Sequence, residues 1–407
     1  METIPLFAHR TKRMKENVLR EILKAAASAD AVSLAGGIPA PESFPVDIIA
    51  GLTEIVLKKY GTAPLQYGPS EGFPPLRHAI AQFLATKGLA VSPQDILVTS
   101  GSQGALDGVG KILINKGDKL AVESPTYLGA LHAFNPYEPE YLSLETDEEG
   151  PTPDSMIRLI TRHNVKFIYL VPTFQNPTGR SISLGRRQEI AGVIRRYNVL
   201  LLEDDPYSDL RYRGDTIPPI HQFAPDHVIY LGTLSKILAP GLRVGYCIVP
   251  QRVKKWMVIA KQGIDLHTSS LSQAICAEYL QGGFYQAHLP RILEIYAPRL
   301  AAMLGALDDY FPAAFSWSTP EGGMFVWAQG PPGTDMEKVG MDAIKKNIYI
   351  VPGKYFHISP NKGRESMRLN FTMQSEETIR HAIRVLSEIV RNHMARAERD
   401  TRESACA

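Results

Sequence analysis

The sequence predicts an α/β protein with a mostly parallel sheet covered by helices on both faces, followed by a smaller α+β domain. From about residue 75 to residue 250, short apolar runs alternate with helix-like segments, the pattern of repeated βαβ units. After about residue 285 the pattern changes to long helical stretches around short strands. A chain of 407 residues is long enough for two or three domains. We therefore expect a large parallel-sheet domain and a separate C-terminal domain.

The strands are predicted from short runs rich in aliphatic and aromatic residues. Lys166–Val171 is aliphatic or aromatic at every position after the lysine, as in a strand that is buried on both faces. The similar runs of the first domain are Asp95–Thr99, Lys119–Glu123, Val199–Glu203, His227–Leu231 and Val244–Val249. In the second domain they are Met324–Ala328 and Met367–Phe371.

The helices are predicted between and after these runs, at Pro75–Lys87, Ser102–Ile114, Pro153–His163, Gly185–Tyr197, Leu289–Tyr310 and Glu376–Arg396. A basic helix is expected at Lys12–Lys24, ahead of a loop at 36–45 that is too rich in Gly and Pro for a helix or a central strand. The predicted division is an N-terminal arm at 1–32, expected to lie over the functional site, a large domain at 33–285 and a small domain at 286–407.

Composition argues against several classes of function. Forty-four Lys and Arg against forty-two Asp and Glu leave a formal charge of +2, so there is no general electrostatic case for binding nucleic acid or a membrane. Cys247, Cys276 and Cys406 are too few and too scattered for a disulfide framework or a zinc site. No apolar run suggests a membrane span, and the N-terminus lacks the apolar core of a secretory signal. We expect a soluble, cytoplasmic protein that holds no metal.

Parallel sheets bind ligands beyond the carboxyl ends of their strands, so the residues after each run are the candidates for function. Ser102 and Gln103 lie in a small-residue turn that opens a helix, where N–H groups and a hydroxyl suit a phosphate; a tight turn without a ligand explains the pattern about as well. Tyr127 can stack on a planar ring or simply pack a loop. Asn176 lies in an Asn-Pro-Thr-Gly turn that needs no function but would point an amide at the same rim.

Charged residues follow the next two runs. Asp204 and Asp205 close a hydrophobic strand, where a carboxylate is costly unless a cation or a donor meets it; a helix-capping aspartate is the alternative. Lys236 lies among small hydroxyl residues, seven positions before Arg243. Desolvation and a neighbouring cation both lower the pKa of a lysine and make its amine nucleophilic near neutral pH, whereas a lone lysine on such a loop is usually a solvated surface residue.

Together these groups match the needs of one ligand, pyridoxal 5′-phosphate. Its aldehyde condenses with a lysine amine, its ring nitrogen needs an acidic partner, and its phosphate needs hydroxyls, N–H groups and a cation. Each residue has a structural explanation when it is considered singly. Five strand ends that each offer a suitable group favour a common site.

The sequence resembles the fold-type I pyridoxal-phosphate enzymes of the class I/II aminotransferase family, and within it the kynurenine/2-aminoadipate aminotransferase branch. The resemblance runs in order from about residue 33 to residue 372, and it implies a seven-stranded sheet in the large domain. Its motifs are Ser33-Leu34-Ala35-Gly36-Gly37-Ile38-Pro39, Leu65-Gln66-Tyr67-Gly68, Gly101-Ser102-Gln103, Asn176-Pro177-Thr178-Gly179, Glu203-Asp204-Asp205-Pro206-Tyr207, Ser235-Lys236, Gly241-Leu242-Arg243-Val244-Gly245, Gly322-Gly323-Met324-Phe325-Val326-Trp327, Val351-Pro352-Gly353 and Met367-Arg368-Leu369.

The resemblance implies a role for each matching residue. Lys236 resembles the lysine that binds the cofactor covalently and then transfers the substrate proton. Asp204 resembles the partner of the ring nitrogen, and Tyr127 resembles the aromatic residue that stacks on the pyridine. Asn176 and Tyr207 resemble the donors to the cofactor's phenolate oxygen. The positions that resemble the phosphate-binding residues are Ser102, Gln103, Thr233, Ser235 and Arg243.

The same resemblance implies how substrates and subunits are arranged. Arg368 resembles the clamp for the substrate α-carboxylate, a bidentate task suited to a guanidinium. Gly37 resembles a backbone position that contacts the substrate, as does Asn176. Tyr67 resembles a residue lent to the cofactor site of a neighbouring subunit, which implies a homodimer with shared active sites. Arg20 lies where this branch has a mobile arginine for acidic substrates, although one more solvated charge on a basic helix explains it equally well.

The implied function is a pyridoxal-phosphate-dependent aminotransferase of amino acid metabolism. It would move the amino group of an L-amino acid of the 2-aminoadipate, aromatic or branched-chain type to 2-oxoglutarate by a ping-pong mechanism. A C–S lyase, a synthase or a decarboxylase of the same fold uses the same lysine and aspartate and stays open. A regulator that fuses a winged-helix module to this fold is disfavoured because only thirty-two residues precede the Ser33 loop. A pure binding protein is disfavoured because many reactive groups are aimed at one point.

Overall fold

The computed structural model describes residues 6–14, 22, 30–359 and 361–406. At its centre lies a seven-stranded sheet in the order β2-β10-β9-β8-β7-β3-β4. Neighbouring strands are parallel except at β10, which runs antiparallel to both β2 and β9. The strands are β2 (Ile96–Thr99), β3 (Lys119–Val122), β4 (Glu140–Ser143), β7 (Val165–Leu170), β8 (Leu200–Asp205), β9 (Val228–Thr233) and β10 (Gly245–Ile248). The predicted mostly parallel sheet is confirmed.

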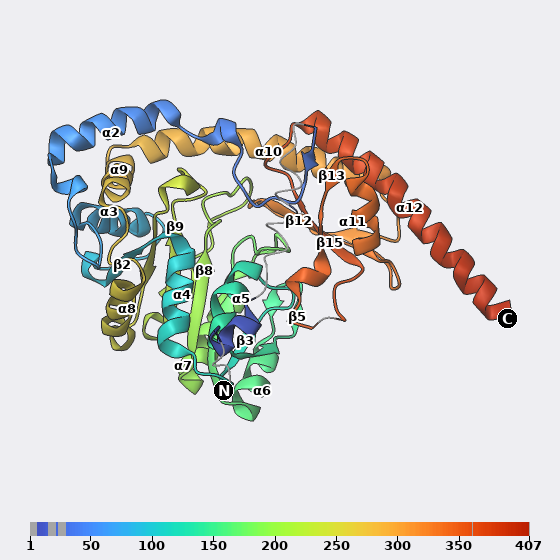
Figure 1. Ribbon diagram of the computed structural model, residues 1–407, viewed down its shortest axis with the longest axis horizontal. Helices are drawn as coiled ribbons and strands as arrows, with labels where there is room; N and C mark the ends of the chain where they lie inside the picture. Colours follow the sequence, from blue (N-terminus) through green and yellow to red (C-terminus); the bar gives the residue numbers. More distant parts are fainter. Residues whose placement is uncertain (1–5, 15–21, 23–29, 360, 407) are drawn as a thin grey trace.

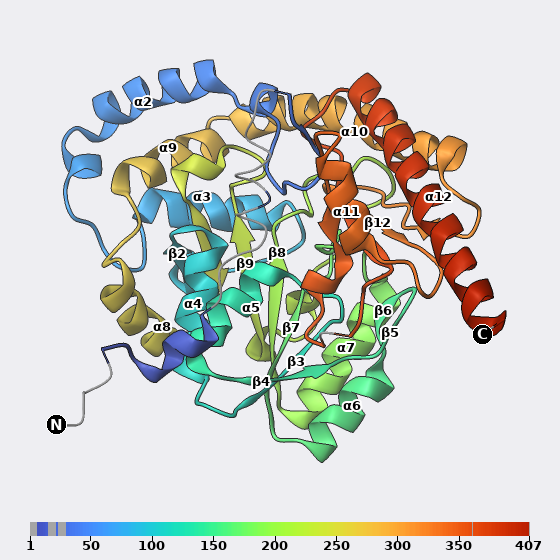
Figure 2. The same ribbon diagram turned by 45° about the vertical axis from the view of Figure 1, so that its right-hand side comes forward.

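Helices cover both faces of this sheet (Figures 1 and 2). The helices that share a core with the first face are α4 (Gly101–Leu113), α5 (Leu128–Phe134) and α8 (Gln251–Ile264). Those of the second face are α2 (Val46–Tyr60), α3 (Pro74–Ala85), α6 (Pro153–Arg162), α7 (Leu184–Tyr197) and α9 (Ser270–Gln281). Because strand side chains alternate between faces, β7 serves both cores: Phe167 and Tyr169 lie in the first, Ile168 and Leu170 in the second.

Local sequence explains where individual helices begin and end. The hydroxyl of Thr152 accepts a hydrogen bond from the third residue after it, and Ser183 does the same at the start of α7. Pro153 occupies the first position of α6, where its missing N–H group has no cost. Asn198 follows the last residue of α7 and ends the helix by adopting the left-handed conformation, with φ 51°.

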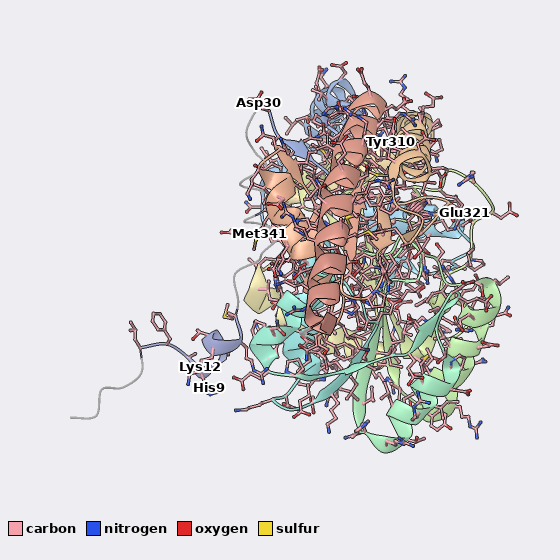
Figure 3. The ribbon with its side chains drawn as sticks, turned by 90° about the vertical axis from the view of Figure 1, so that its right-hand side faces the viewer. His9, Lys12, Asp30, Tyr310, Glu321 and Met341 are labelled. Carbon is pink, nitrogen blue, oxygen red and sulfur yellow. The ribbon has the colours of Figure 1, made fainter. Side chains whose placement is uncertain are left out.

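A four-stranded sheet in the order β11-β12-β15-β14 lies beside the first (Figure 1). Its strands are β11 (Ser316–Trp317), β12 (Phe325–Gln329), β14 (Val351–Pro352) and β15 (Ser366–Asn370), and its helices are α10 (Phe284–Tyr310), α11 (Met336–Ile344) and α12 (Glu376–Cys406). Figure 3 shows α12 crossing this part of the molecule, with Tyr310 at the end of α10 beside it. The boundary predicted between residues 285 and 286 falls at the start of α10 and stays a prediction.

The N-terminal segment reaches the second sheet region through a short strand. β1 (Val32–Ser33) pairs in parallel with β13 (Ile348–Tyr349). Ahead of it, the described residues contain one 3-10 helix, His9–Arg13, whose first residue contacts Glu138 at 2.8 Å. Of the basic helix predicted at Lys12–Lys24, only residues 12–14 and 22 are among the described residues. Its place over the site therefore stays a prediction.

The structure also contains elements that the sequence pattern did not predict. Strand β4 lies at the edge of the large sheet, and its residues are exposed or half-buried, so it has no continuous apolar run. Helix α5 has only seven residues, too few for a helical period to stand out. Helices α2, α8 and α9 were likewise not predicted from the sequence.

Other features of the described residues concern the thiols, metals and membranes. Cys247 and Cys276 are buried free thiols, and burial raises the pKa of Cys247 to about 12. Among the described residues, no three His, Cys, Asp or Glu side chains gather in a way that suits a metal ion. No described helix is long and apolar enough to span a membrane.

Candidate active site

A cavity of about 430 Å³ lies beyond the carboxyl ends of the parallel strands. The segments after β2, β3, β7, β8 and β9 contribute to its lining, together with the segment after β1 and strand β15 of the second sheet. The predicted site residues that line it are Gly37, Ser102, Gln103, Tyr127, Asn176, Asp204, Tyr207, Thr233, Ser235, Lys236, Arg243 and Arg368. The fold therefore brings together side chains that are widely separated in the sequence.

Two predicted residues are not among those that line this cavity. Tyr67 is 79% exposed, and its ring lies edge-on to that of His267 with 5.8 Å between the centroids. An exposed side chain suits a role in a neighbouring subunit, and for the single chain that role stays a prediction. Arg20 lies outside the described residues, so its role as a substrate switch also stays a prediction.

Lys236 follows β9 and directs its amine into the cavity. Its Nζ donates a 2.8 Å hydrogen bond to the carbonyl of Gly37. Burial lowers the pKa of the amine to about 8, helped by the positive charges of Arg368 and Arg243. An appreciable fraction of the amine is therefore uncharged and nucleophilic near neutral pH.

Asp204 lies near the end of β8 and is 2% exposed. Its Oδ2 accepts a 2.8 Å hydrogen bond from the hydroxyl of Tyr169, whereas its Oδ1 is buried and has no partner. Burial raises the pKa of this carboxyl to about 7, although the bond from Tyr169 opposes the rise. A buried acceptor without a donor is a group that a ligand can satisfy, and the protonated ring nitrogen of pyridoxal phosphate fits it.

The acids next to Asp204 belong to the other face of the sheet. Asp205 accepts a 2.8 Å hydrogen bond from the hydroxyl of Tyr230, a residue of the second core. Glu203 accepts two bonds from the backbone N–H groups of the segment that begins at Ile220. Because side chains alternate along β8, Asp204 is the acid of this strand that lines the cavity.

The start of α4 and the loop after β9 form an anion-binding wall. Ser102 and Gln103 lie in the first turn of α4, where backbone N–H groups have no partner within the helix. The hydroxyls of Thr233 and Ser235 are hydrogen-bonded to each other at 2.9 Å. Arg243 donates a bond of 3.2 Å to a carbonyl of the turn before α4. Hydroxyls, helix N–H groups and a guanidinium are a suitable donor set for a phosphate dianion.

Two glycines make this wall possible. A Cβ on Gly101, whose φ is +71°, would lie 2.5 Å from a guanidinium nitrogen of Arg243. A Cβ on Gly245 would lie 2.6 Å from the carbonyl carbon of Gly101 and 2.8 Å from the backbone nitrogen of Ser102. Strand β10 thus approaches the start of α4 more closely than any larger residue permits.

Arg368 enters the cavity from β15 and is 2% exposed. Its guanidinium lies between two rings, 4.3 Å from the centroid of Phe325 and 5.0 Å from that of Phe356. It donates to the side chain of Asn176 at 2.9 Å and to the carbonyl of Ala35, while its Nε has no partner. Burial lowers its pKa to about 10, so it stays a cation at neutral pH. A fixed guanidinium with unused N–H capacity can bind a carboxylate.

Phenol and amide groups form the remaining polar lining. The Nδ2 of Asn176 lies 3.5 Å from the hydroxyl of Tyr207. Burial raises the pKa of Tyr127 to about 12 and that of Tyr207 further, so both phenols are protonated donors at neutral pH. Only glycine at position 129 leaves room for the ring of Tyr127, because a Cβ there would lie 2.4 Å from its hydroxyl oxygen.

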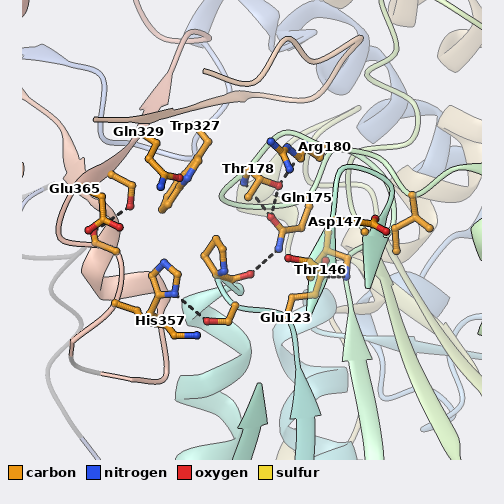
Figure 4. Close-up of a pocket in the computed structure, with 18 of the residues that line it drawn as sticks. Glu123, Thr146, Asp147, Gln175, Thr178, Arg180, Trp327, Gln329, His357 and Glu365 are labelled. Carbon is orange, nitrogen blue, oxygen red and sulfur yellow. Dashed lines mark hydrogen bonds between the residues drawn. The ribbon is translucent and has the colours of Figure 1, made fainter. Parts of the chain in front are cut away.

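Figure 4 shows a second cavity, of about 430 Å³. Val171 is a lining residue of both cavities. Gln175 reaches into the second cavity, donating to a backbone carbonyl at 2.9 Å and accepting from the backbone N–H of Thr178 at 3.0 Å. Glu123, at the end of β3, accepts a bond from the backbone N–H of Val171 at 3.2 Å. These bonds connect the segments after β3 and β7 on either side of Asn176.

Sequence reasoning missed part of the site. It did not identify the apolar lining residues Ile38, Val171, Pro206 and Pro240. It also missed Tyr169, although a hydroxyl within a strand predicted to be buried is a signal that a polar partner lies nearby. The apolar positions carry no comparable signal, because they look like any other loop or core residue.

Comparisons with known proteins give one consistent result. The family model for aminotransferase class I and II matches residues 57–386. Aromatic-amino-acid aminotransferase 1 of Thermococcus litoralis is 42% identical over 395 residues, which cover 95% of this chain and 94% of the relative. The multiple substrate aminotransferase of Thermococcus profundus has a TM-score of 0.91 at 42% identity, over 96% of this chain and 98% of that one. The α-aminoadipate aminotransferase of Thermus thermophilus, solved with N-(5′-phosphopyridoxyl)-L-leucine, has a TM-score of 0.88 at 36% identity, over 96% and 98%.

The close approach of β10 to α4 generates a stability prediction. Gly245→Ala is expected to destabilise the protein by about 1–3 kcal/mol, because the new methyl group would overlap backbone atoms that cannot rotate away. Urea unfolding would measure the loss. Gly241→Ala is the matched control, since a Cβ at that nearby position meets nothing within 4 Å. Equal unfolding midpoints for the two variants would contradict the explanation.

Proposed function

The chain belongs to the aminotransferase class I and II family, and from that premise we propose that it transfers the amino group of an aromatic, branched-chain or 2-aminoadipate-type L-amino acid to 2-oxoglutarate by a ping-pong mechanism. The family itself identifies the chain as a pyridoxal-phosphate-dependent aminotransferase, and the donor and acceptor are what we propose. The observation that carries the proposal is that Lys236, Asp204 and Arg368 line one cavity with complementary chemistry.

The residues of this cavity suggest how it would hold the cofactor. Pyridoxal phosphate, when bound, supplies an electron sink that stabilises negative charge on the substrate α-carbon. The free oxygen of Asp204 would hold the proton on the ring nitrogen, and Tyr127 would cover the ring face. The phosphate would lie against the anion-binding wall described above, with Arg243 as its cation. Asn176 and Tyr207 would donate hydrogen bonds to the ring oxygen.

The protein's own groups then act on the substrate. Arg368 binds the α-carboxylate and so fixes the orientation of the bonds at the α-carbon. Lys236 takes the α-proton and returns it, a role suited to an amine whose pKa burial brings to about 8.

The substrate class is supported by the lining and by the similar proteins. Ile38, Val171, Pro206 and Pro240 give the cavity apolar surface beside its charged groups. Such a lining suits an apolar or aromatic side chain, and the similar proteins described above act on aromatic amino acids, α-aminoadipate or multiple substrates. The 2-oxoglutarate acceptor and the ping-pong order are proposed from the branch resemblance. Arg20 would accommodate the distal carboxylate of acidic substrates.

The first functional prediction concerns the lysine. Borohydride reduction of the protein with its cofactor is expected to fix the cofactor on Lys236 as a secondary amine, which peptide mass mapping would locate. Lys236→Ala is expected to lose both half-reactions while still binding the cofactor through its phosphate. Lys58→Ala is a suitable control because that amine lies on the exposed surface of α2. A reduced adduct on any other lysine would overturn the assignment.

The second prediction concerns the reaction and its substrates. A panel of twenty L-amino acids with 2-oxoglutarate as acceptor is expected to release glutamate, most rapidly with aromatic, branched-chain or 2-aminoadipate donors. Glutamate formation should match the keto acid formed from the donor, because one amino group moves per cycle. Release of ammonia, carbon dioxide or hydrogen sulfide without glutamate would instead indicate a deaminating, decarboxylating or C–S lyase reaction.

The surface around Tyr67 supports a homodimer. Tyr67 and Leu65 are exposed, and Leu266, beside the residue that Tyr67 contacts, is 47% exposed. Large apolar side chains grouped on two neighbouring loops are typical of a surface that a partner covers. We propose that a second copy of the chain covers this surface and receives Tyr67 at its cofactor site.

Subunit mixing would test this arrangement. Tyr67→Phe protein has reduced activity if the hydroxyl serves the partner's site. Adding an excess of inactive Lys236→Ala protein, followed by subunit exchange, should raise the activity per Tyr67→Phe chain toward the wild-type value. The Lys236 of one chain would then face the Tyr67 of the other. An excess of the double variant, Lys236→Ala with Tyr67→Phe, is the matched control and should give no rise.

A further inference from the structure

We propose that Tyr169 is a positioning residue that holds the Asp204 carboxylate in place and keeps it ionised toward the cofactor ring nitrogen. This inference rests on the assignment of pyridoxal phosphate to the cavity. Tyr169 lies behind Asp204 and is not among the residues that line the cavity, so it would act through the aspartate and not on the substrate.

The contact is well defined on both sides. Tyr169 is fully buried in β7, and its hydroxyl donates to Oδ2 of Asp204 at 2.8 Å. With that oxygen occupied, the carboxylate presents Oδ1, which is buried and has no partner. One oxygen is therefore held by the protein and the other is left for the ligand. A carboxylate fixed at one oxygen also has little freedom to rotate.

The sheet explains why the hydroxyl reaches this oxygen. Tyr169 is the register partner of Leu202 on β8, and Asp204 lies two residues further along the same face. The ring of Tyr169 packs edge-on against Phe134 of α5, with 6.0 Å between the centroids. Its path is fixed by this packing, so the hydroxyl points along the sheet toward the end of β8.

The hydrogen bond from Tyr169 also affects whether a proton lies on the cofactor ring nitrogen or on the Asp204 carboxylate. Burial raises the pKa of the Asp204 carboxyl most, the bond from Tyr169 lowers it, and the charge of Asp205 raises it. Without the tyrosine hydroxyl the carboxyl therefore becomes more basic. A more basic carboxyl takes the proton from the ring nitrogen, and a neutral ring is a weaker electron sink. The bond from Tyr169 thus favours a charged pair over a neutral one.

The chain provides a matched control on the opposite face. Tyr230 is also almost fully buried, and its hydroxyl donates at 2.8 Å to Oδ2 of the next acid, Asp205. Tyr169→Phe and Tyr230→Phe therefore each remove a hydroxyl, one from β7 and one from β9, that donates to one of two neighbouring acids on β8. Any loss due only to a missing buried hydrogen bond should be similar in the two variants.

The test is ¹⁵N NMR of each variant loaded with pyridoxal phosphate labelled at the ring nitrogen, together with steady-state kinetics. In Tyr169→Phe the resonance should move toward the unprotonated position. The kcat should fall by roughly ten- to hundredfold with little change in KM, as expected when an outer partner of a reacting group is lost. Tyr230→Phe should keep the wild-type resonance and a kcat close to that of the wild type.

The two readouts separate this inference from the proposed function. The ring-nitrogen resonance needs only bound cofactor, so it reports on Tyr169 even if the reaction is not amino transfer. An unchanged resonance in Tyr169→Phe, or the same change in both variants, would overturn the inference. If Tyr169→Phe does not fold, urea unfolding will show it. Tyr169→Leu and Tyr230→Leu, which remove the same two hydroxyls, then replace the pair, and the same difference between their resonances is expected.

Discussion

A carboxylate buried near the end of an apolar strand is the constraint on which the rest of the site depends. Asp204 is 2% exposed, and an ionised group in that position costs several kcal/mol unless donors or cations meet it. The protein supplies a donor to only one of the two carboxylate oxygens: the hydroxyl of Tyr169 bonds Oδ2, and Oδ1 has no partner. A ligand that donates to Oδ1 would offset the remaining cost of burying this charge, so the site favours a protonated heterocycle.

The sheet makes this arrangement possible by separating neighbouring acids. Alternation along β8 places Asp204 on the face of α4 and α5, while Asp205 meets Tyr230 of the opposite core. The tight approach of Gly245 to Ser102 then brings the start of α4 to the same edge. Strand direction and close backbone packing thus bring a buried carboxylate and an N–H-rich helix start to one edge, as a ring nitrogen and a phosphate would require.

What the sequence could predict depended on the kind of interaction. Lys166–Val171 differs from the observed β7 by one residue at each end, because a strand buried on both faces has a distinctive composition. The residues after the strands were predicted because chain direction alone brings them to one edge. The contact between Tyr169 and Asp204 joins two strands, and periodicity does not tell which hydroxyl meets which carboxylate. The role of Tyr67 depends on a second chain, so it was expected only from the family resemblance and not from any pattern of strands or helices.

The position of Arg368 has a consequence for how such an enzyme can change over time. Arg368 belongs to the four-stranded sheet, whereas Lys236 and Asp204 belong to segments of the seven-stranded one. The distance between the Arg368 guanidinium and the Lys236 amine therefore depends on how the two sheets pack in their shared core and on the bond from Arg368 to Asn176. We expect substitutions at that contact to change this distance while every residue in the cavity stays the same.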